Sequence, residues 1–136
     1  MRLLGVDFGF ARIGVAVGET AAKIATPRPT MAASGTLKRD AQALHDLACR
    51  EEVEAIVLGY PLGDEGEEGK MARVVRQLQG HLEALGHRVT LVDESMTSVQ
   101  AETTMFEAGL KGSERRKRRD GEAACLILQR AMESHD

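Results

Sequence analysis

The chain has 136 residues, of which 43% are hydrophobic, and this length suits one domain with a single core, spanning residues 1–136. It excludes architectures that enclose a nucleotide between two domains, such as sugar kinases and actin-like ATPases. Aromatic residues make up only 3% of the chain and Trp is absent, which argues against a nucleic-acid binder that relies on base stacking. The net charge is −3, yet acidic residues gather at 64–68 and basic residues at 111–119, so a local basic surface is compatible with the negative total.

The first third of the chain predicts three strands. Residues 3–8 form an apolar run, and a short link joins it to a second run at 13–17, which indicates an antiparallel hairpin. A third strand is expected within 23–31, where Pro27 and Pro29 allow only an edge position or an irregular extension.

The rest of the chain alternates between helices and strands. Helices are predicted at 36–51, at 71–85, from 97 and from 120, and short buried strands at 55–58 and 88–92. Gly86 is placed to end the second helix, and Thr97 with Gln100 forms a capping box for the third. The segment 110–118 lacks apolar periodicity and is predicted to be a basic loop. This order implies an α/β fold with a mixed five-stranded sheet, its first three strands antiparallel, flanked by helices.

Asp7 interrupts the first apolar run. Strand alternation places Gly5, Asp7 and Gly9 on one face of the strand and Leu4, Val6 and Phe8 on the other. An aspartate that merely begins a turn does not need glycine on both sides of its own face. We therefore favour a functional carboxylate, with room around it for a metal ion and a substrate.

Two further carboxylates stand at the ends of predicted elements. Glu94 follows the strand 88–92, and ligand sites gather at the carboxyl ends of parallel strands; a solvated loop charge is an equal alternative. Asp120 is followed by apolar residues at helical spacing, so it shares their buried stripe. An Asp N-cap is the alternative for Asp120, although Ala123 stands where a capping box would place Glu or Gln.

Asp7, Glu94 and Asp120 lie far apart in sequence but beside apolar segments, where a charge needs compensation. Oxygen ligands of this kind favour Mg²⁺ or Mn²⁺ over zinc. Two such ions, roughly 4 Å apart, can cleave a phosphodiester bond. The carboxylates therefore predict a two-metal-ion hydrolase.

Basic residues near these carboxylates predict phosphate contacts. Those expected to bind nucleic acid are Arg12, Lys111, Arg115, Arg116, Lys117, Arg118 and Arg119. The alternative for the run at 111–119 is a solvated charge run. Tyr60, in a stiff turn after the strand 55–58, could stack on a base or simply fill a surface groove.

Cys49 and Cys125 lack zinc-ligand spacing and are expected to be buried free thiols in a reducing compartment. No signal peptide or long apolar stretch is evident, so we expect a cytoplasmic protein with no membrane contact. The four histidines share no spacing.

The ordered motifs resemble the YqgF family, which is described both as pre-16S rRNA nucleases and as Holliday junction resolvases. The resemblance runs from end to end, and the stretches that carry it are Gly5–Gly9 with Arg12–Ala16, Gly59–Leu62, Asp93–Glu94 with Thr97, and Asp120–Ala124 with Ile127–Leu128. It implies an RNase H-like fold with catalytic carboxylates at Asp7, Glu94 and Asp120. It also implies cleavage of precursor ribosomal RNA or of branched DNA. We expect a monomer or a homodimer, since a junction resolvase would act as a symmetric dimer on two equivalent strands.

Three positions depart from the family pattern. Ala11 stands where Lys is frequent, Ser95 where Arg is usual, and Gly63 where Asn often follows the Pro-Leu turn. None is a predicted metal ligand, so they bear on how the substrate phosphate is held. Ala11 and Ser95 also suggest an alternative function, a nucleic-acid-binding module without catalysis that acts in transcription or ribosome assembly.

Overall fold

The computed structural model describes residues 1–61, 69–93 and 112–133, with side chains in the last segment described from residue 121. The strands are β1 (Arg2–Phe8), β2 (Arg12–Glu19), β3 (Ile24–Ala32), β4 (Ala55–Tyr60) and β5 (Val89–Asp93). The helices are α1 (Leu37–Arg50), α2 (Lys70–Ala84) and α4 (Gly112–Glu133). No helix within the described residues combines the length and apolar character needed to span a bilayer.

The strands form one five-stranded sheet in the order β3-β2-β1-β4-β5. β1 pairs antiparallel with β2, and β2 pairs antiparallel with β3. β4 runs parallel to β1, and β5 runs parallel to β4. The predicted mixed sheet is therefore confirmed, and β3 occupies the edge that its two prolines allow.

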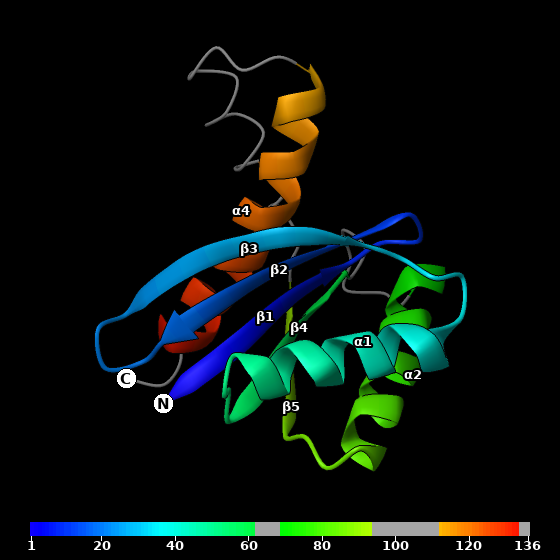
Figure 1. The fold of residues 1–136 in the computed structure, drawn as a ribbon, viewed down its shortest axis with the longest axis horizontal. Coiled ribbons are helices and arrows are strands. Elements are labelled where there is room, and N and C mark those ends of the chain that lie inside the picture. Colours follow the sequence, from blue (N-terminus) through cyan, green and yellow to red (C-terminus); the bar gives the residue numbers. More distant parts are fainter. Residues whose placement is uncertain (62–68, 94–111, 134–136) are drawn as a thin grey trace.

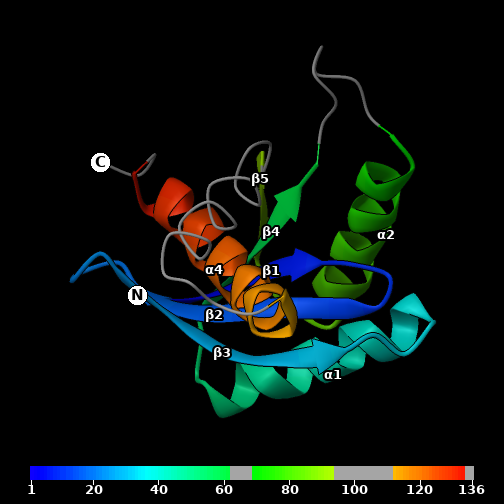
Figure 2. The same cartoon turned by 90° about the horizontal axis from the view of Figure 1, so that it is seen from above.

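Helices cover both faces of the sheet: α1 and α2 pack on one face, and α4 crosses the other (Figures 1 and 2). The larger core lies under α1 and α2 and includes Leu4 and Val6 of β1. The smaller core lies under α4 and includes Leu3 of β1 with Ala124 and Leu128 of the helix. The alternation predicted for β1 is thus realised, with the face that carries Asp7 turned toward α4.

The prediction that 110–118 is a loop was wrong for most of that segment. α4 begins at Gly112 and runs for 22 residues, so residues 112–118 are helical. Arg, Lys and Glu are good helix formers, and this part of the helix extends beyond the sheet (Figure 1), where no apolar stripe is needed. Asp120 does not open the helix but lies in its interior, which removes the N-cap alternative.

Two smaller expectations differ from the structure. Cys49 is exposed rather than buried, because it lies outside the apolar stripe of α1. Leu85, the last residue of the helix predicted at 71–85, lies beyond the end of α2 at Ala84 and is 39% exposed, and Gly86 then turns the chain with a φ of 95°. The acidic loop at 64–68 and the capping box at 97–100 lie outside the described residues.

Gly5 allows α4 to lie almost against β1. A Cβ built on Gly5 would stand 2.5 Å from Leu128 Cγ and 2.8 Å from the Ala124 carbonyl oxygen. The second contact is with backbone, so a side chain at position 5 would displace the helix itself. The absence of a side chain at Gly5 therefore sets the distance between α4 and the strand that carries Asp7.

We predict that Gly5→Ala lowers the free energy of unfolding by about 1–3 kcal/mol, because the added methyl group overpacks this contact. Gly80→Ala is the matched control, since a Cβ at this position in α2 meets nothing within 4 Å. The control should raise the free energy of unfolding by about 0.5–1 kcal/mol. Urea denaturation of both variants measures the difference, and equal effects would contradict the tight approach of α4.

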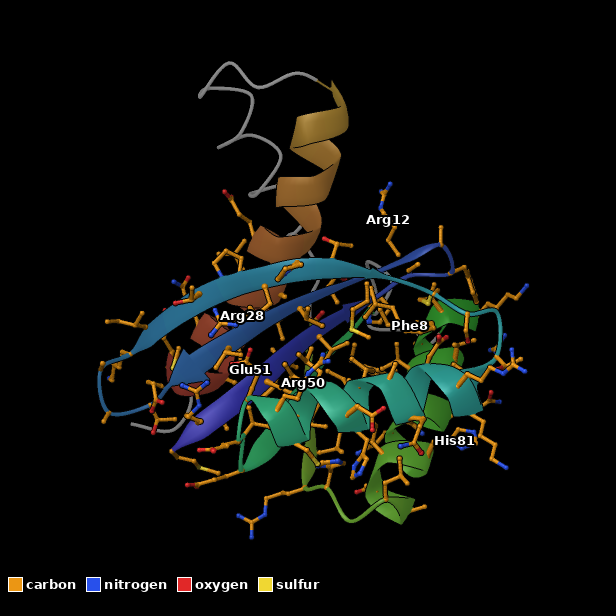
Figure 3. The ribbon with its side chains drawn as sticks, in the orientation of Figure 1. Phe8, Arg12, Arg28, Arg50, Glu51 and His81 are labelled. Carbon is orange, nitrogen blue, oxygen red and sulfur yellow. The ribbon has the colours of Figure 1, made fainter. Side chains whose placement is uncertain are left out.

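A network of ion pairs ties α1 to the sheet. Glu51, after the end of α1, accepts a hydrogen bond from Arg28 Nε at 2.8 Å (Figure 3) and another from Arg2 Nη2 at 3.0 Å. The hydrogen bond from Arg28 is the main reason why the pKa of the Glu51 carboxyl lies below its usual 4.5. The same contact raises the pKa of Arg28. The side chain of Arg28 is thus part of a structural network.

We predict that Glu51→Gln lowers the free energy of unfolding by about 1 kcal/mol at neutral pH. A carboxyl group with a lowered folded-state pKa stabilises the fold above its unfolded-state pKa, and this contribution disappears as the pH falls through the folded-state value. The difference between the parent and the variant should therefore shrink below about pH 4.5. Denaturation of the parent and the variant across pH tests this, with Glu83→Gln, at an exposed position of α2, as the control. If the difference in free energy of unfolding persists in acid, the ion-pair network does not contribute as described.

Candidate functional site

Asp7 is half-buried near the end of β1, among positions without side chains. Gly5 precedes it on the same face, and Gly9 opens the link to β2. Gly14 is its pairing partner in β2, and Gly59 follows the β4 residue that pairs with Val6. Glycines of three adjacent strands therefore border the Asp7 carboxylate.

A carboxylate bordered by glycines suits a divalent cation. A hydrated cation and a phosphate need space beside their ligand, and a carboxylate is the donor that Mg²⁺ and Mn²⁺ prefer. A Cβ on Gly9 would stand 2.8 Å from the carbonyl oxygen of Arg12, so the glycine also lets the hairpin close tightly next to Asp7. The residues present at Asp7 are thus compatible with a metal site.

Helix α4 crosses the sheet from β1 toward β3. A Cβ on Gly5 would meet Leu128 and the Ala124 carbonyl oxygen, whereas a Cβ on Gly121, three residues earlier in the helix than Ala124, would stand 3.1 Å from the Cβ of Pro27 in β3. Asp120 directly precedes Gly121 in this helix, and its side chain is not among those described.

The carboxyl end of β5 lies beside that of β4, because Asp93 pairs with Tyr60. Arg130 of α4 donates a hydrogen bond from Nη1 to the carbonyl oxygen of Asp93. The chain is therefore fastened to α4 immediately before Glu94, which itself lies outside the described residues. Sequence reasoning missed Arg130, since nothing in a helical pattern indicates that a side chain reaches the backbone of a distant strand.

The predicted nucleic-acid-binding residues fall into three groups. Arg12 is exposed on the face of β2 turned toward α4, and it projects from the hairpin end of the sheet (Figure 3). The basic residues 115–119 lie in the part of α4 that extends beyond the sheet, and Lys111 lies outside the described residues. Tyr60 packs against the opposite face, where its hydroxyl accepts a hydrogen bond from Arg76 Nε at 3.0 Å. The structure thus does not bring Tyr60 to the face of Asp7.

Two histidines without shared spacing meet in the structure. His45 Nδ1 and His87 Nε2 lie 2.7 Å apart, and burial, followed by the charge of His45, lowers the pKa of His87. Within the described part of the chain, no group of three or more His, Cys, Asp or Glu side chains is arranged to hold a metal ion. Asp7 is the one predicted ligand whose side chain that description includes.

The sequence profile of one family, RuvX, described as Holliday junction resolvase, matches residues 1–134. This chain belongs to the RuvX family. A protein of Anaeromyxobacter sp. (strain K), named "Putative pre-16S rRNA nuclease", is 41% identical over 130 residues, which cover 95% of this chain and 94% of the relative. A relative of the same name from Myxococcus xanthus (strain DK1622) is 40% identical, with 99% and 89% of the two chains covered.

Solved structures share the fold of this RuvX-family chain at low sequence identity. Thermus thermophilus RuvC, in complex with a Holliday junction substrate, matches with a TM-score of 0.60 and 17% identity, covering 99% of this chain and 95% of the other. The Fowlpox virus resolvase, in complex with Holliday junction DNA, matches with a TM-score of 0.57 and 12% identity, covering 99% of both chains. The expected RNase H-like fold is therefore confirmed.

We predict that Arg130→Met loosens the end of β5 without unfolding the protein, because it removes the donor to Asp93 and keeps an apolar side chain. Amide hydrogens of residues 89–93 should exchange several-fold faster, since local opening exposes them. Hydrogen exchange followed by mass spectrometry measures this, with the exposed Arg73→Met of α2 as control. Unchanged exchange in 89–93 would show that this contact does not hold the strand.

Proposed function

We propose that this chain, as a single domain over residues 1–136, is a metal-dependent nuclease that hydrolyses phosphodiester bonds during the maturation of precursor 16S ribosomal RNA. Membership of the RuvX family and the names of its relatives support the reaction and the substrate. The observation that carries the proposal is that glycines border the Asp7 carboxylate on the face of the sheet that α4 approaches closely. A cytoplasmic location is part of the proposal.

Asp7, Glu94 and Asp120 would hold two Mg²⁺ or Mn²⁺ ions in this proposal. Divalent cations, when bound, activate a water molecule and neutralise the charge that develops on the leaving oxygen. In this proposal, β1 would position Asp7 and the Arg130 contact would hold the backbone before Glu94. The close approach at Gly5 would hold the helix that carries Asp120. Small shifts in such positions cost large factors in rate.

Arg12 and the basic residues 115–119 would bind phosphates on either side of the scissile bond. Contacts of this kind release counterions, so binding should weaken steeply as salt increases. Phosphate contacts do not distinguish one base from another. They therefore explain affinity for a polyanion and leave the choice of substrate to other parts of the surface.

Two other functions remain as alternatives. The family description and the fold shared with Holliday junction resolvases favour a resolvase acting on branched DNA, which would work as a symmetric dimer. Ala11 and Ser95 favour a nucleic-acid-binding module without catalysis, because they remove basic groups expected near the phosphate. The module would bind with the same salt dependence but would not cleave.

We predict that Asp7→Asn reduces Mn²⁺- or Mg²⁺-dependent cleavage by at least about 100-fold, because a neutral amide is a poor ligand for a hard cation. Binding of the same RNA should change little, because phosphate contacts are made elsewhere. The assay uses a structured RNA with a single-stranded extension and a four-way DNA junction, in parallel. Asp46→Asn, an exposed aspartate of α1, is the matched control.

Each result separates the alternatives. Cleavage of the RNA alone supports the ribosomal function, and cleavage of the junction alone supports the resolvase. Binding without cleavage by the parent protein supports the non-catalytic module. Cleavage by Asp7→Asn at the rate of the parent would refute the assignment of Asp7.

A further inference from the structure

A groove lies between the edge strand β3 and helix α4, on the face of the sheet that carries Asp7. It encloses about 630 Å³ and is mostly apolar. The residues that line it and matter here are Arg12, Pro27, Pro29, Ala32, Gly121 and Glu122. This volume falls within the range of roughly 300–1,000 Å³ that is typical of sites for small organic groups.

The groove continues the candidate active site. Arg12, which lines it, precedes Gly14 by two residues on the same face of β2, and Gly14 is the pairing partner of Asp7. Gly121, on the other wall, directly follows Asp120 in α4. A strand of nucleic acid that passes Asp7 toward the edge of the sheet would therefore enter this groove.

The edge strand β3 is irregular where it lines the groove. The pairing of β2 with β3 shifts register between Ile13 and Val15, at the level of Pro29. Such irregularities bend a strand and are common beside active sites. Proline rings carry no N–H group, so Pro27 and Pro29 present apolar surface and no donors that would need water.

The residues that line the groove match the base, the phosphate and the exocyclic amino group of a nucleotide. The flat face of a base is apolar and can lie against the proline rings and Ala32. Arg12 brings a positive charge for a phosphate at the end of the groove near Asp7. Glu122 offers an acceptor for an exocyclic amino group, as acidic side chains do for cytosine.

We propose that this groove binds an unpaired nucleotide next to the scissile phosphate, with its base against Pro27 and Pro29 and its phosphate at Arg12. The proposal rests on the proposed nuclease function and deepens it, since it assigns the substrate class as structured nucleic acid with a single-stranded extension. A paired base cannot enter, because its faces are covered by stacked neighbours and its edge is occupied. Unpaired bases are the usual targets of base-specific recognition in RNA.

The test compares binding of a hairpin RNA that carries a short unpaired extension with binding of the blunt hairpin. Measurements use the Asp7→Asn background, so that cleavage does not consume the RNA. Ala32→Leu fills the groove, since Ala32 pairs with Arg12 and shares its face. Thr26→Leu is the matched control, because Thr26 is an exposed residue of β3 that does not line the groove.

We expect the protein that carries Asp7→Asn alone, with Ala32 intact, to bind the extended hairpin roughly tenfold more tightly than the blunt one. Ala32→Leu should lose this preference while its affinity for the blunt hairpin stays unchanged, and Thr26→Leu should keep it. A 4-thiouridine in the extension should cross-link to residues 27–32 on irradiation. The same measurement with a DNA extension of the same sequence shows which part of the nucleotide is recognised. If the DNA extension also raises affinity, the base is recognised; if it does not, the 2′-hydroxyl group is recognised.

Three results would overturn the proposal. Equal affinity for both hairpins, measured on the Asp7→Asn protein that retains Ala32, would refute a site for an unpaired nucleotide. A preference that survives in Ala32→Leu, or cross-links confined to other segments, would place that nucleotide elsewhere. In these cases the nuclease function stands, whereas failure to bind any of the nucleic acids would refute both proposals.

Discussion

The contact between helix α4 and strand β1 at Gly5 is the constraint on which the candidate site depends. Asp7 belongs to β1 and Asp120 to α4, so their separation follows from how closely the two elements approach. A Cβ at Gly5 would stand 2.8 Å from the Ala124 carbonyl oxygen, which leaves the helix no room to adopt its position with any other residue there. Arg130 extends the same arrangement to β5 through its bond to Asp93. Helix α4 thus contacts both β1, which carries Asp7, and the end of β5, which directly precedes Glu94 in the sequence.

The two faces of the sheet differ in how much apolar core they bury. The face under α1 and α2 buries the larger core, and the pairs of Glu51 with Arg2 and Arg28 fasten that layer to the start of the sheet. The face under α4 is lined near the site by glycines, which bury little apolar surface and so contribute little to folding. The proposed site would hold a hydrated metal ion and a phosphate, and small residues beside Asp7 would suit both. The packing on the opposite face compensates for these small residues, because stability is a property of the whole cooperative domain.

Local patterns predicted most of the fold and part of the site. Alternation in β1 placed Asp7 on the face away from Leu4 and Val6, and the prolines of β3 placed that strand at the edge. The helical state of the basic residues was missed, because periodicity reports burial and this part of α4 covers no sheet. The Arg130 contact, the groove along β3 and the meeting of His45 with His87 depend on distances between elements, which a single sequence does not encode in any local pattern.

We propose that Asp7, Glu94 and Asp120 hold divalent cations together. A crystal of the protein soaked in Mn²⁺ provides the test, since anomalous scattering locates the metal without reference to activity. We expect anomalous peaks within coordination distance, about 2.0–2.3 Å, of carboxylate oxygens of all three residues. Manganese bound only at other residues, or carboxylates too far apart to share an ion, would contradict it.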